Sequence, residues 1–373
     1  MKTEYKICTR CIMDTTDPEI IFSEDGTCNH CSRYDELVQL IGYKKGKSEK
    51  QLELLVNKIK EYGRNKEYDA IIGISGGVDS AYLTYLAHKL GLRILAVHVD
   101  AGWNTNIAVE NIEKLCKKLN IDLHTIVIDW PTMKELQRAY LFSGLPNLDV
   151  PQDHVFLSAM YDYALKYNIK YMLNGSNIAT ESILPKAWGY DAMDYSSIKS
   201  VYKTCGRGKS LKKYPHTCLL RYYYLQLKIK RINLLNYVDY SKEGAINMLS
   251  KEFDWNYYGG KHYESRFTKF FQSYYLPKRF KYDKKRAHLS SLVVNGELSR
   301  EEALRQMEDN SIYTLEQMEE DRDYILKKLD ITRDEWEAIM SAPLKNEDDY
   351  KNNKKIRKFI SGLHSKARKM KNK

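Results

Sequence analysis

Six consecutive residues, Ser75-Gly76-Gly77-Val78-Asp79-Ser80, combine residue types that can hold a phosphate group. The glycines let the backbone approach an anion closely, and the serine hydroxyls can donate to its oxygens. An apolar run precedes the segment and a helical pattern follows it, so free amides at the helix start would face the anion. The spacing is not that of the Walker loop, which carries a lysine, or of the G-x-G-x-x-G dinucleotide turn. We predict a phosphate loop of another type, with a plain glycine turn as the alternative.

Four cysteines near the N-terminus have the spacing of a structural metal site. Cys8-x-x-Cys11 and Cys28-x-x-Cys31 are two thiol pairs separated by 16 residues, an arrangement in which two turns converge on a tetrahedral zinc ion. Four thiolates leave no open coordination position, so we expect Zn²⁺ to stabilise the fold and not to take part in chemistry. The alternatives are an iron–sulfur cluster, a redox pair, or His30 in place of one cysteine.

Further polar residues follow apolar runs, where the strands of a parallel sheet would end. Asp100 ends the run 93–99, and Asn174-Gly175-Ser176-Asn177 follows the run 171–173. Ligands bind at the carboxyl ends of parallel strands, so we expect both segments near the phosphate loop. A turn or helix-cap aspartate and a simple polar turn are the alternatives. Asp153 and Glu181 are lesser candidates, because a lone carboxylate is usually solvated.

A third group of candidates lies in Tyr258-Gly259-Gly260-Lys261-His262-Tyr263-Glu264-Ser265. This stretch concentrates flexible backbone, cationic donors and a proton acceptor within a few residues. A charged, solvated helix start is the alternative interpretation.

The elements that position these residues follow from hydrophobic periodicity. Short apolar runs at 68–74, 93–99, 122–128 and 171–173 alternate with helical patterns at 80–90, 107–119 and 156–167. This alternation predicts an α/β domain with a parallel sheet covered by helices on both faces. A helical pattern at 48–62 leads into it. Beyond residue 250, Ser299-x-x-Glu302, Thr314-x-x-Gln317 and Thr332-x-x-Glu335 resemble capping boxes and predict three helices.

Composition sets the frame for these elements. The chain has 373 residues, 43% hydrophobic and 29% charged, which is ordinary for a soluble globular protein of two or three domains. No apolar run is long enough for a membrane span and the first residues are polar, so we expect a cytoplasmic protein. We expect four regions: a cysteine module at 1–45, the sheet domain at 46–250, a helical C-terminal region at 251–345 and a basic tail at 346–373.

The net charge of +11 is concentrated at one end. Residues 351–373 hold ten Lys or Arg and no acid, so the rest of the chain is nearly neutral. Such a tail is typical of a solvated or docking segment, with polyanion binding as the second choice. A nearly neutral body argues against a nucleic-acid partner.

The Ser-Gly-Gly-x-Asp-Ser motif after the first strand resembles the pyrophosphatase loop (PP-loop) of the ATP-splitting amidotransferase and thiolase superfamily. Those enzymes cleave ATP between its α and β phosphates, adenylate a carbonyl oxygen and let a nitrogen or sulfur nucleophile displace AMP. The resemblance implies an adenine nucleotide α-hydrolase-like domain that uses ATP and Mg²⁺, with Asp79 close to the magnesium. The ATP-binding residues that we infer from the motif and the strand ends are Ser75, Gly76, Gly77, Asp79, Ser80, Asp100, Gly175 and Asn177.

Together with the cysteine module, the Lys261 segment and the stretches 283–290 and 296–304, the loop closely resembles the bacterial N-acetyl sugar amidotransferases. The resemblance runs from Cys8 to about Leu304. It implies that an N-acetyl group on a nucleotide-linked sugar becomes an acetamidino group, for surface polysaccharides such as lipopolysaccharide O-antigen. Lys261 and His262 are candidates to stabilise developing charge or bind the sugar nucleotide's phosphates, and Glu264 to orient one of them; with Asp79 they form the expected catalytic set.

The chain shows no sign of its own ammonia source. It opens Met1-Lys2 where a glutaminase with an N-terminal nucleophile needs cysteine, and neither Cys205 nor Cys218 lies in a G-x-C-x-G elbow. The resemblance implies a partner glutaminase subunit with a cyclase-like barrel subunit. The leading alternative function is tRNA thiolation. It is disfavoured because the sequence has no third cysteine pair near the expected nucleotide site. A zinc-bearing nucleic-acid module with a vestigial nucleotide fold is a further alternative, and it predicts no ATP turnover.

Overall fold

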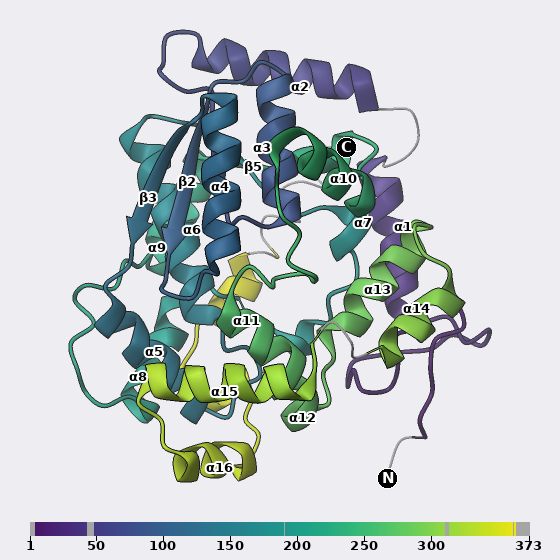
Figure 1. The fold of residues 1–373 in the computed structure, drawn as a ribbon, viewed down its shortest axis with the longest axis vertical. Helices are drawn as coiled ribbons and strands as arrows, with labels where there is room; N and C mark the ends of the chain where they lie inside the picture. Colours follow the sequence, from purple (N-terminus) through teal and green to yellow (C-terminus); the bar gives the residue numbers. More distant parts are fainter. Residues whose placement is uncertain (1–3, 43–47, 190, 310–312, 361, 363–373) are drawn as a thin grey trace.

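The computed structural model describes residues 4–42, 48–189, 191–309, 313–360 and 362 (Figure 1). Residues 43–45 of the predicted cysteine module and 363–373 of the predicted basic tail lie outside the described residues. A sheet domain lies at the centre of the chain, with the N-terminal module and the C-terminal helices packed around one end of it.

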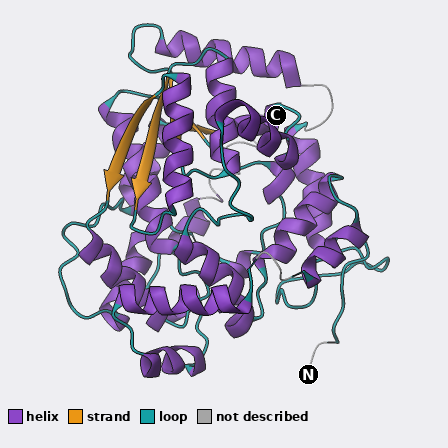
Figure 2. Cartoon of the chain, in the orientation of Figure 1, coloured by secondary structure: helices purple, strands orange, loops and turns teal. Residues whose placement is uncertain are grey.

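The sheet is parallel and five-stranded, in the order β3-β2-β1-β4-β5. Figure 2 shows strands of this sheet in orange among the surrounding helices. The chain moves outward from β1 to β2 and β3, then crosses back and adds β4 on the other side of β1. The switch in direction therefore lies between β1 and β4, which is where open sheets bind ligands. This confirms the predicted α/β fold. The strands are β1 Ala70–Gly73, β2 Ile94–Asp100, β3 Asp122–Val127, β4 Tyr171–Leu173 and β5 Lys230–Ile232.

Alternating side chains of the strands pack into two cores, one on each face of the sheet. Ile71 and Leu95 belong to one core, whereas Ala70, Ile72 and Ile94 belong to the other. Helices α3, α4 and α10 cover the second face, and α5, α6, α8 and α9 cover the first. The sheet is thus buried on both sides, which is why β1 and β2 read as continuous apolar runs.

The edge strand β5 was not predicted. Two of its three residues, Lys230 and Arg231, are exposed, so no apolar run marks it in the sequence. Its pairing with β4 alone defines it.

Most predicted helices are present, with one shifted boundary. Helix α6 begins at Val150 and not at residue 156, because Pro151 occupies the first turn, where a missing amide donor costs nothing. None of the described helices is long and apolar enough to cross a membrane. The helices are α1 Asn29–Ile41, α2 Ser48–Gly63, α3 Val78–Lys89, α4 Asn106–Leu119, α5 Trp130–Phe142, α6 Val150–Lys166, α7 Ile178–Glu181, α8 Tyr195–Cys205, α9 Leu219–Lys228, α10 Lys242–Phe253, α11 Arg266–Phe270, α12 Leu276–Phe280, α13 Lys284–Asn295, α14 Arg300–Glu308, α15 Leu315–Leu329 and α16 Arg333–Ser341.

The three predicted C-terminal helices correspond to α14, α15 and α16. Thr314 and Thr332 form reciprocal capping boxes, whereas Ser299 caps α14 without a return bond from Glu302. Helices α11, α12 and α13 precede them and carry no such box, so the sequence pattern missed them. Shorter helical turns complete the chain at Lys186–Trp188, Leu234–Tyr237, Phe271–Tyr275 and Glu347–Asp349.

The cysteine module packs against α13 and α14, close to 300 residues away in sequence (Figure 1). Arg300 of α14 donates to the backbone carbonyls of Cys8 and Cys11, at 2.9 and 3.1 Å. Arg286 of α13 donates to the carbonyl of Ile12 at 2.7 Å, and Ile12 is buried in a small apolar cluster with Leu289 and Ala303. The module therefore contacts α13, a helix that also packs against α7.

Candidate functional site

A cavity of about 780 Å³ opens at the carboxyl ends of β1 and β4, at the switch point of the sheet. It is lined by the loop after β1, the turn after β4, the segment 258–265, and the first turns of α6, α10 and α13. Nearly all the predicted site segments thus meet in one place, together with residues that were not predicted.

The backbone of the loop Ser75–Ser80 requires glycine at position 76, whereas position 77 is crowded by the end of the Glu264 side chain. Gly76 has a φ of +82°, and a Cβ there would lie 2.6 Å from the carbonyl oxygen of Ala108. A Cβ on Gly77 would lie 2.9 Å from Oε1 of Glu264. Gly77 is the N-cap of α3 and supplies no side-chain cap. The Val78 amide donates to Tyr258 Oη at 3.2 Å, so the next amides of the first turn, those of Asp79 and Ser80, are the ones available for an anion.

The two loop hydroxyls lie together beside these amides. Ser75 Oγ and Ser80 Oγ are 3.2 Å apart, and the Gly77 amide donates to Ser75 Oγ at 3.2 Å. Hydroxyls and uncapped amides around a tight bend form a set of donors that matches a pyrophosphate group.

Asp79, on the first turn of α3, lies at the centre of a polar network. Its carboxylate accepts hydrogen bonds from Tyr240 and from Asn177 Nδ2 at 3.4 Å, and it lies 3.3 Å from Lys261 Nζ. Burial alone would raise the pKa of Asp79, but the charge of Lys261 and the Tyr240 bond outweigh it and hold the pKa below its usual value. Asp79 is therefore ionised at neutral pH.

Lys261 joins this network from the loop before α11. Its ammonium group lies 2.9 Å from Glu181 Oε1 and donates to Thr180 Oγ1 at 3.0 Å, in addition to its contact with Asp79. Burial opposes the charge, but the two carboxylates raise its pKa above the ordinary lysine value. Lys261 is a fixed cation beside the phosphate loop, and Glu181 is one of its partners.

His262 and Glu264 follow on the same loop. His262 adopts a positive φ of 64°, and its Nδ1 lies 3.9 Å from Glu264 Oε1. The other oxygen of Glu264, Oε2, is buried and has no hydrogen-bond partner among the described residues. A buried carboxylate oxygen without a partner, next to a phosphate loop, fits a hard cation such as Mg²⁺, which takes oxygen ligands. Asp79 and Glu264 are the residues that would hold it.

Three predicted ATP-binding residues have structural contacts of their own. Asp100 accepts from the Gly102 amide at 2.7 Å and from Asn104 Nδ2 at 3.1 Å, in a turn after β2, and it is not among the described residues that line the cavity. Asn177 caps α7 by accepting from the Thr180 amide at 2.9 Å. Gly175 lines the cavity and passes close to the backbone of α3, where a Cβ would lie 3.4 Å from the Ser80 amide.

Two lysines that sequence reasoning missed also line the cavity. Lys242 begins α10 and Lys284 begins α13. Burial lowers the pKa of both, that of Lys284 to about 8. A cation is disfavoured at a helix N-terminus by the helix dipole, so a lysine at that position is a signal that could have identified both residues.

Another part of the cavity lining carries two carboxylates and an imidazole. Asp149 occupies the N-cap position of α6 without a side-chain capping bond, Asp153 lies on the first turn of that helix, and His288 lies on α13. Burial, with the charge of Asp153 next, raises the pKa of Asp149 to about 7. The Asp153 side chain is exposed to the cavity, where partial loss of hydration raises its pKa to about 6. Burial lowers the pKa of His288 well below its usual value, so the imidazole is neutral.

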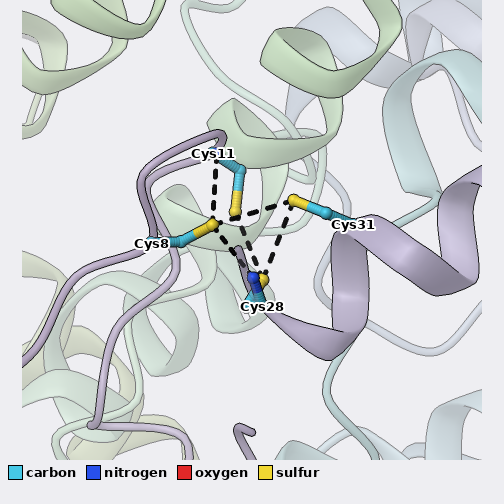
Figure 3. Close-up of side chains that lie close together, drawn as sticks. All are labelled: Cys8, Cys11, Cys28 and Cys31. Atoms are coloured by element: carbon cyan, nitrogen blue, oxygen red, sulfur yellow. Dashed lines mark hydrogen bonds between the residues drawn. The ribbon is translucent and has the colours of Figure 1, made fainter. Parts of the chain in front are cut away.

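The four N-terminal cysteines converge as predicted (Figure 3). Their sulfurs lie within 4.8 Å of one another, with separations of 3.8 Å for Cys8–Cys31, 3.6 Å for Cys11–Cys28 and 3.8 Å for Cys28–Cys31. A tetrahedral ion bound at about 2.3 Å by each sulfur separates those sulfurs by about 3.8 Å. The cluster thus fits a single zinc ion, and His30 instead pairs with Asp17 at 2.6 Å.

Two family models match the chain. Residues 69–187, which include the phosphate loop, match the model described as "Queuosine biosynthesis protein QueC". Residues 264–363, from Glu264 onward, match "LPS biosynthesis protein WbpG-like, C-terminal domain". Both matched regions contribute residues that line the same cavity.

Similar proteins cover parts of the chain. The tRNA-specific 2-thiouridylase MnmA 2 of Fusobacterium nucleatum is 26% identical over 139 residues, 35% of this chain and 36% of that protein. The NH(3)-dependent NAD(+) synthetase of Methanococcoides burtonii is 29% identical over 147 residues, 36% of this chain and 53% of that protein. The solved NH3-dependent NAD synthetase of Campylobacter jejuni is 20% identical, with a TM-score of 0.30, covering 55% of this chain and 93% of that one. The chain thus spans about a third to a half of the length of these curated relatives.

Proposed function

We propose that this chain, which belongs to the PP-loop ATP pyrophosphatase superfamily and carries a WbpG-like C-terminal domain, is an ATP-dependent N-acetyl sugar amidotransferase. It adenylates the N-acetyl carbonyl of a nucleotide-linked sugar and lets ammonia displace AMP. The observation that carries the proposal is that the phosphate loop and the start of the WbpG-like region line one cavity. The product, an acetamidino sugar, would serve surface polysaccharide synthesis, consistent with the lipopolysaccharide description of the matched domain.

The proposed reaction has two steps, activation of the carbonyl by ATP and attack by ammonia. An amide carbonyl is a poor electrophile, because the nitrogen lone pair is delocalised into it. Attack of the carbonyl oxygen on the α phosphate forms a C–O–P linkage and releases pyrophosphate. Ammonia then forms a C–N bond at the same carbon, and the C–O bond breaks as AMP leaves with its electron pair. The acetyl oxygen therefore ends in AMP, and an amidine remains on the sugar.

The residues of the phosphate loop supply the first step. The Ser75 and Ser80 hydroxyls and the available amides of the first turn of α3 bind the departing pyrophosphate, and Lys261 offsets its charge. Lys242, which forms no ion pair within the described residues, provides a second cation on the same side. Asp79 and Glu264 would hold Mg²⁺, which would supply positive charge to offset that of the phosphates.

The ammonia source is proposed to be a partner. Cys205 lies against Tyr350 Oη at 3.5 Å and Cys218 is the exposed N-cap residue of α9, so neither reaches the cavity as a glutaminase nucleophile. A glutaminase subunit with a cyclase-like barrel subunit would then deliver ammonia to this chain. Soluble nucleotide substrates favour the cytoplasm as the site of the reaction.

A tRNA thiolation enzyme is the second candidate, favoured by the match to a 2-thiouridylase. Sulfur transfer in such an enzyme calls for a cysteine at the site. None of the described residues that line the cavity is a cysteine, and Cys116 is buried within α4. The cavity therefore supports a nitrogen nucleophile better than a protein persulfide.

The test is incubation of the full chain with ATP, Mg²⁺, ammonium chloride and a panel of N-acetyl sugars linked to UDP, CMP or GDP. We expect release of AMP and pyrophosphate that depends on one class of sugar, and mass spectrometry that shows an oxygen of the sugar replaced by NH. AMP formation that depends on tRNA and on no sugar would support thiolation instead.

A further inference from the structure

Two carboxylates line the cavity outside the phosphate loop. Helix α6 leads into β4, so it runs antiparallel to the strands and its first turn lies at the carboxyl edge of the sheet. Asp149 and Asp153, four residues apart, therefore face the same cavity as the loop, one above the other.

The two carboxylates differ in their surroundings. Asp149 is 7% exposed, and its Oδ1 accepts a hydrogen bond from Gln152 Nε2 at 2.5 Å. Asp153 faces the open cavity, and none of the described residues donates a hydrogen bond to its side chain. Asp149 thus has a fixed position, and Asp153 has free acceptor oxygens next to it.

The groups that face this pair do not neutralise it by contact. Lys284 and His288 approach from α13, His262 from the loop before α11, Glu181 from α7, and Thr268 from α11. No ion pair within 4.0 Å joins either aspartate to a described cation. Two like charges one helical turn apart repel each other, and a small cation between them relieves that cost.

We propose that Asp149 and Asp153 form the subsite that binds the nitrogen nucleophile, here called the acceptor side because it accepts a proton. The two carboxylates bind an ammonium ion and accept the proton that this ion must lose. The proposal rests on the amidotransferase function above. Ammonium transfers one proton to an Asp153 oxygen, and the freed lone pair forms the C–N bond to the adenylated carbon. AMP leaves with the C–O electron pair, and Asp153 returns its proton to solvent through the cavity mouth.

The environment suits this role. An ordinary aspartate is a weak base at neutral pH, whereas burial raises the pKa of Asp149 to about 7. Asp153 keeps an exposed side chain, but its position inside the cavity removes part of its hydration and raises its pKa to about 6, nearer the working pH of a general base. Lys284, whose pKa burial lowers to about 8, adjoins the pair and offers an exit route for the proton.

The experiment separates the two partial reactions with Asp153→Asn and Asp149→Asn. Sugar-dependent exchange of labelled pyrophosphate into ATP, without ammonium, reports adenylation. Amidine formation is then measured with ammonium chloride and with hydroxylamine, an amine already unprotonated at neutral pH. Asp162→Asn, on the same helix but paired with Arg221 at the surface, is the matched control. Circular dichroism melting checks the fold of each variant.

We expect Asp153→Asn to raise the KM for ammonium at least tenfold and to lower the ratio of amidine formation to exchange by a similar factor, while the hydroxylamine reaction falls less than threefold. Equal losses with ammonium and hydroxylamine, or an ammonium KM like that of Asp162→Asn, would overturn the subsite while leaving the amidotransferase function intact. Wild-type protein without any sugar-dependent exchange would overturn both. If Asp149→Asn fails to fold, Asp153→Asn decides alone.

Discussion

The two sides of the cavity are built in different ways. The phosphate side, Ser75–Ser80 with Asn174–Asn177, comes from short segments that directly follow β1 and β4. The acceptor side, Asp149, Asp153, Lys284 and His288, comes from the first turns of two helices more than a hundred residues apart. Local backbone geometry therefore fixes the first side, whereas tertiary packing fixes the second. A change in packing should damage the acceptor side and spare the phosphate side.

The largest effect is expected from Asp79→Ala on the phosphate side. The substitution removes the carboxylate that joins Lys261, Tyr240 and Asn177 and that we place next to Mg²⁺. We expect pyrophosphate release to fall at least about 100-fold, in the range found when a positioned charged group is lost from an active site. Zinc content, measured by atomic absorption, should stay at the wild-type level. Activity within a few-fold of wild type would remove Asp79 from the site.

Cys28→Ser tests whether the acceptor side of the cavity can be disturbed while the phosphate side stays intact. Loss of a thiolate ligand should lower zinc content and destabilise the module by several kcal/mol, because metal binding and folding are coupled. Since Arg286 and Arg300 fasten the module to α13 and α14, amide hydrogen exchange should speed up in α13 far more than in β1. Cys116→Ser, a buried thiol outside the cluster, is the control. Equal acceleration of hydrogen exchange in α13 and β1 would contradict the view that the cysteine module supports α13 and not the phosphate side.

A smaller effect is expected from Gly76→Ala on the phosphate side. The added Cβ meets the Ala108 carbonyl at 2.6 Å in a backbone with φ of +82°, so strain and overlap add. We expect a loss of about 2–3 kcal/mol in the free energy of unfolding, measured with urea. Gly296→Ala has a similar φ of +77° but no atom within 4 Å of the new Cβ, so it should cost only about 1 kcal/mol. Equal costs at both positions would show that crowding at the loop is unimportant.

The smallest effect concerns pH and the acceptor side. The folded-state pKa values of Asp149 and Asp153, about 7 and about 6, exceed the unfolded value of about 3.9, so the native state holds their protons more tightly. Their contribution to stability is present below pH 4 and is lost as pH rises from 4 to 7. Relative to wild type, Asp149→Asn should therefore gain a few degrees in melting temperature at pH 8 compared with pH 5. A difference in melting temperature between Asp149→Asn and wild type that does not change with pH would contradict the raised pKa of Asp149.

The same contrast explains what the sequence could reveal. The phosphate loop and the cysteine pairs are contiguous patterns whose spacing carries their geometry, and their side chains converge as expected. Lys242, Lys284 and Asp149 have no such pattern, because each stands alone at a helix start and only packing brings it to the cavity. Asp100 stays a prediction: its position after a strand indicated a ligand contact, and in the structure its carboxylate accepts from the Gly102 amide within its own turn.

The contact between the cysteine module and α13 has a consequence for biosynthesis. Ile12 and its partner Ser290 are separated by 278 residues, and Arg300 and Cys8 by 292. The module therefore leaves the ribosome long before its docking surface has been translated, and its apolar Ile12 must wait in solvent for most of that time. Enclosure of the cavity is among the last events in the maturation of the polypeptide, because α13, which carries Lys284 and His288, is translated after the phosphate loop and both aspartates.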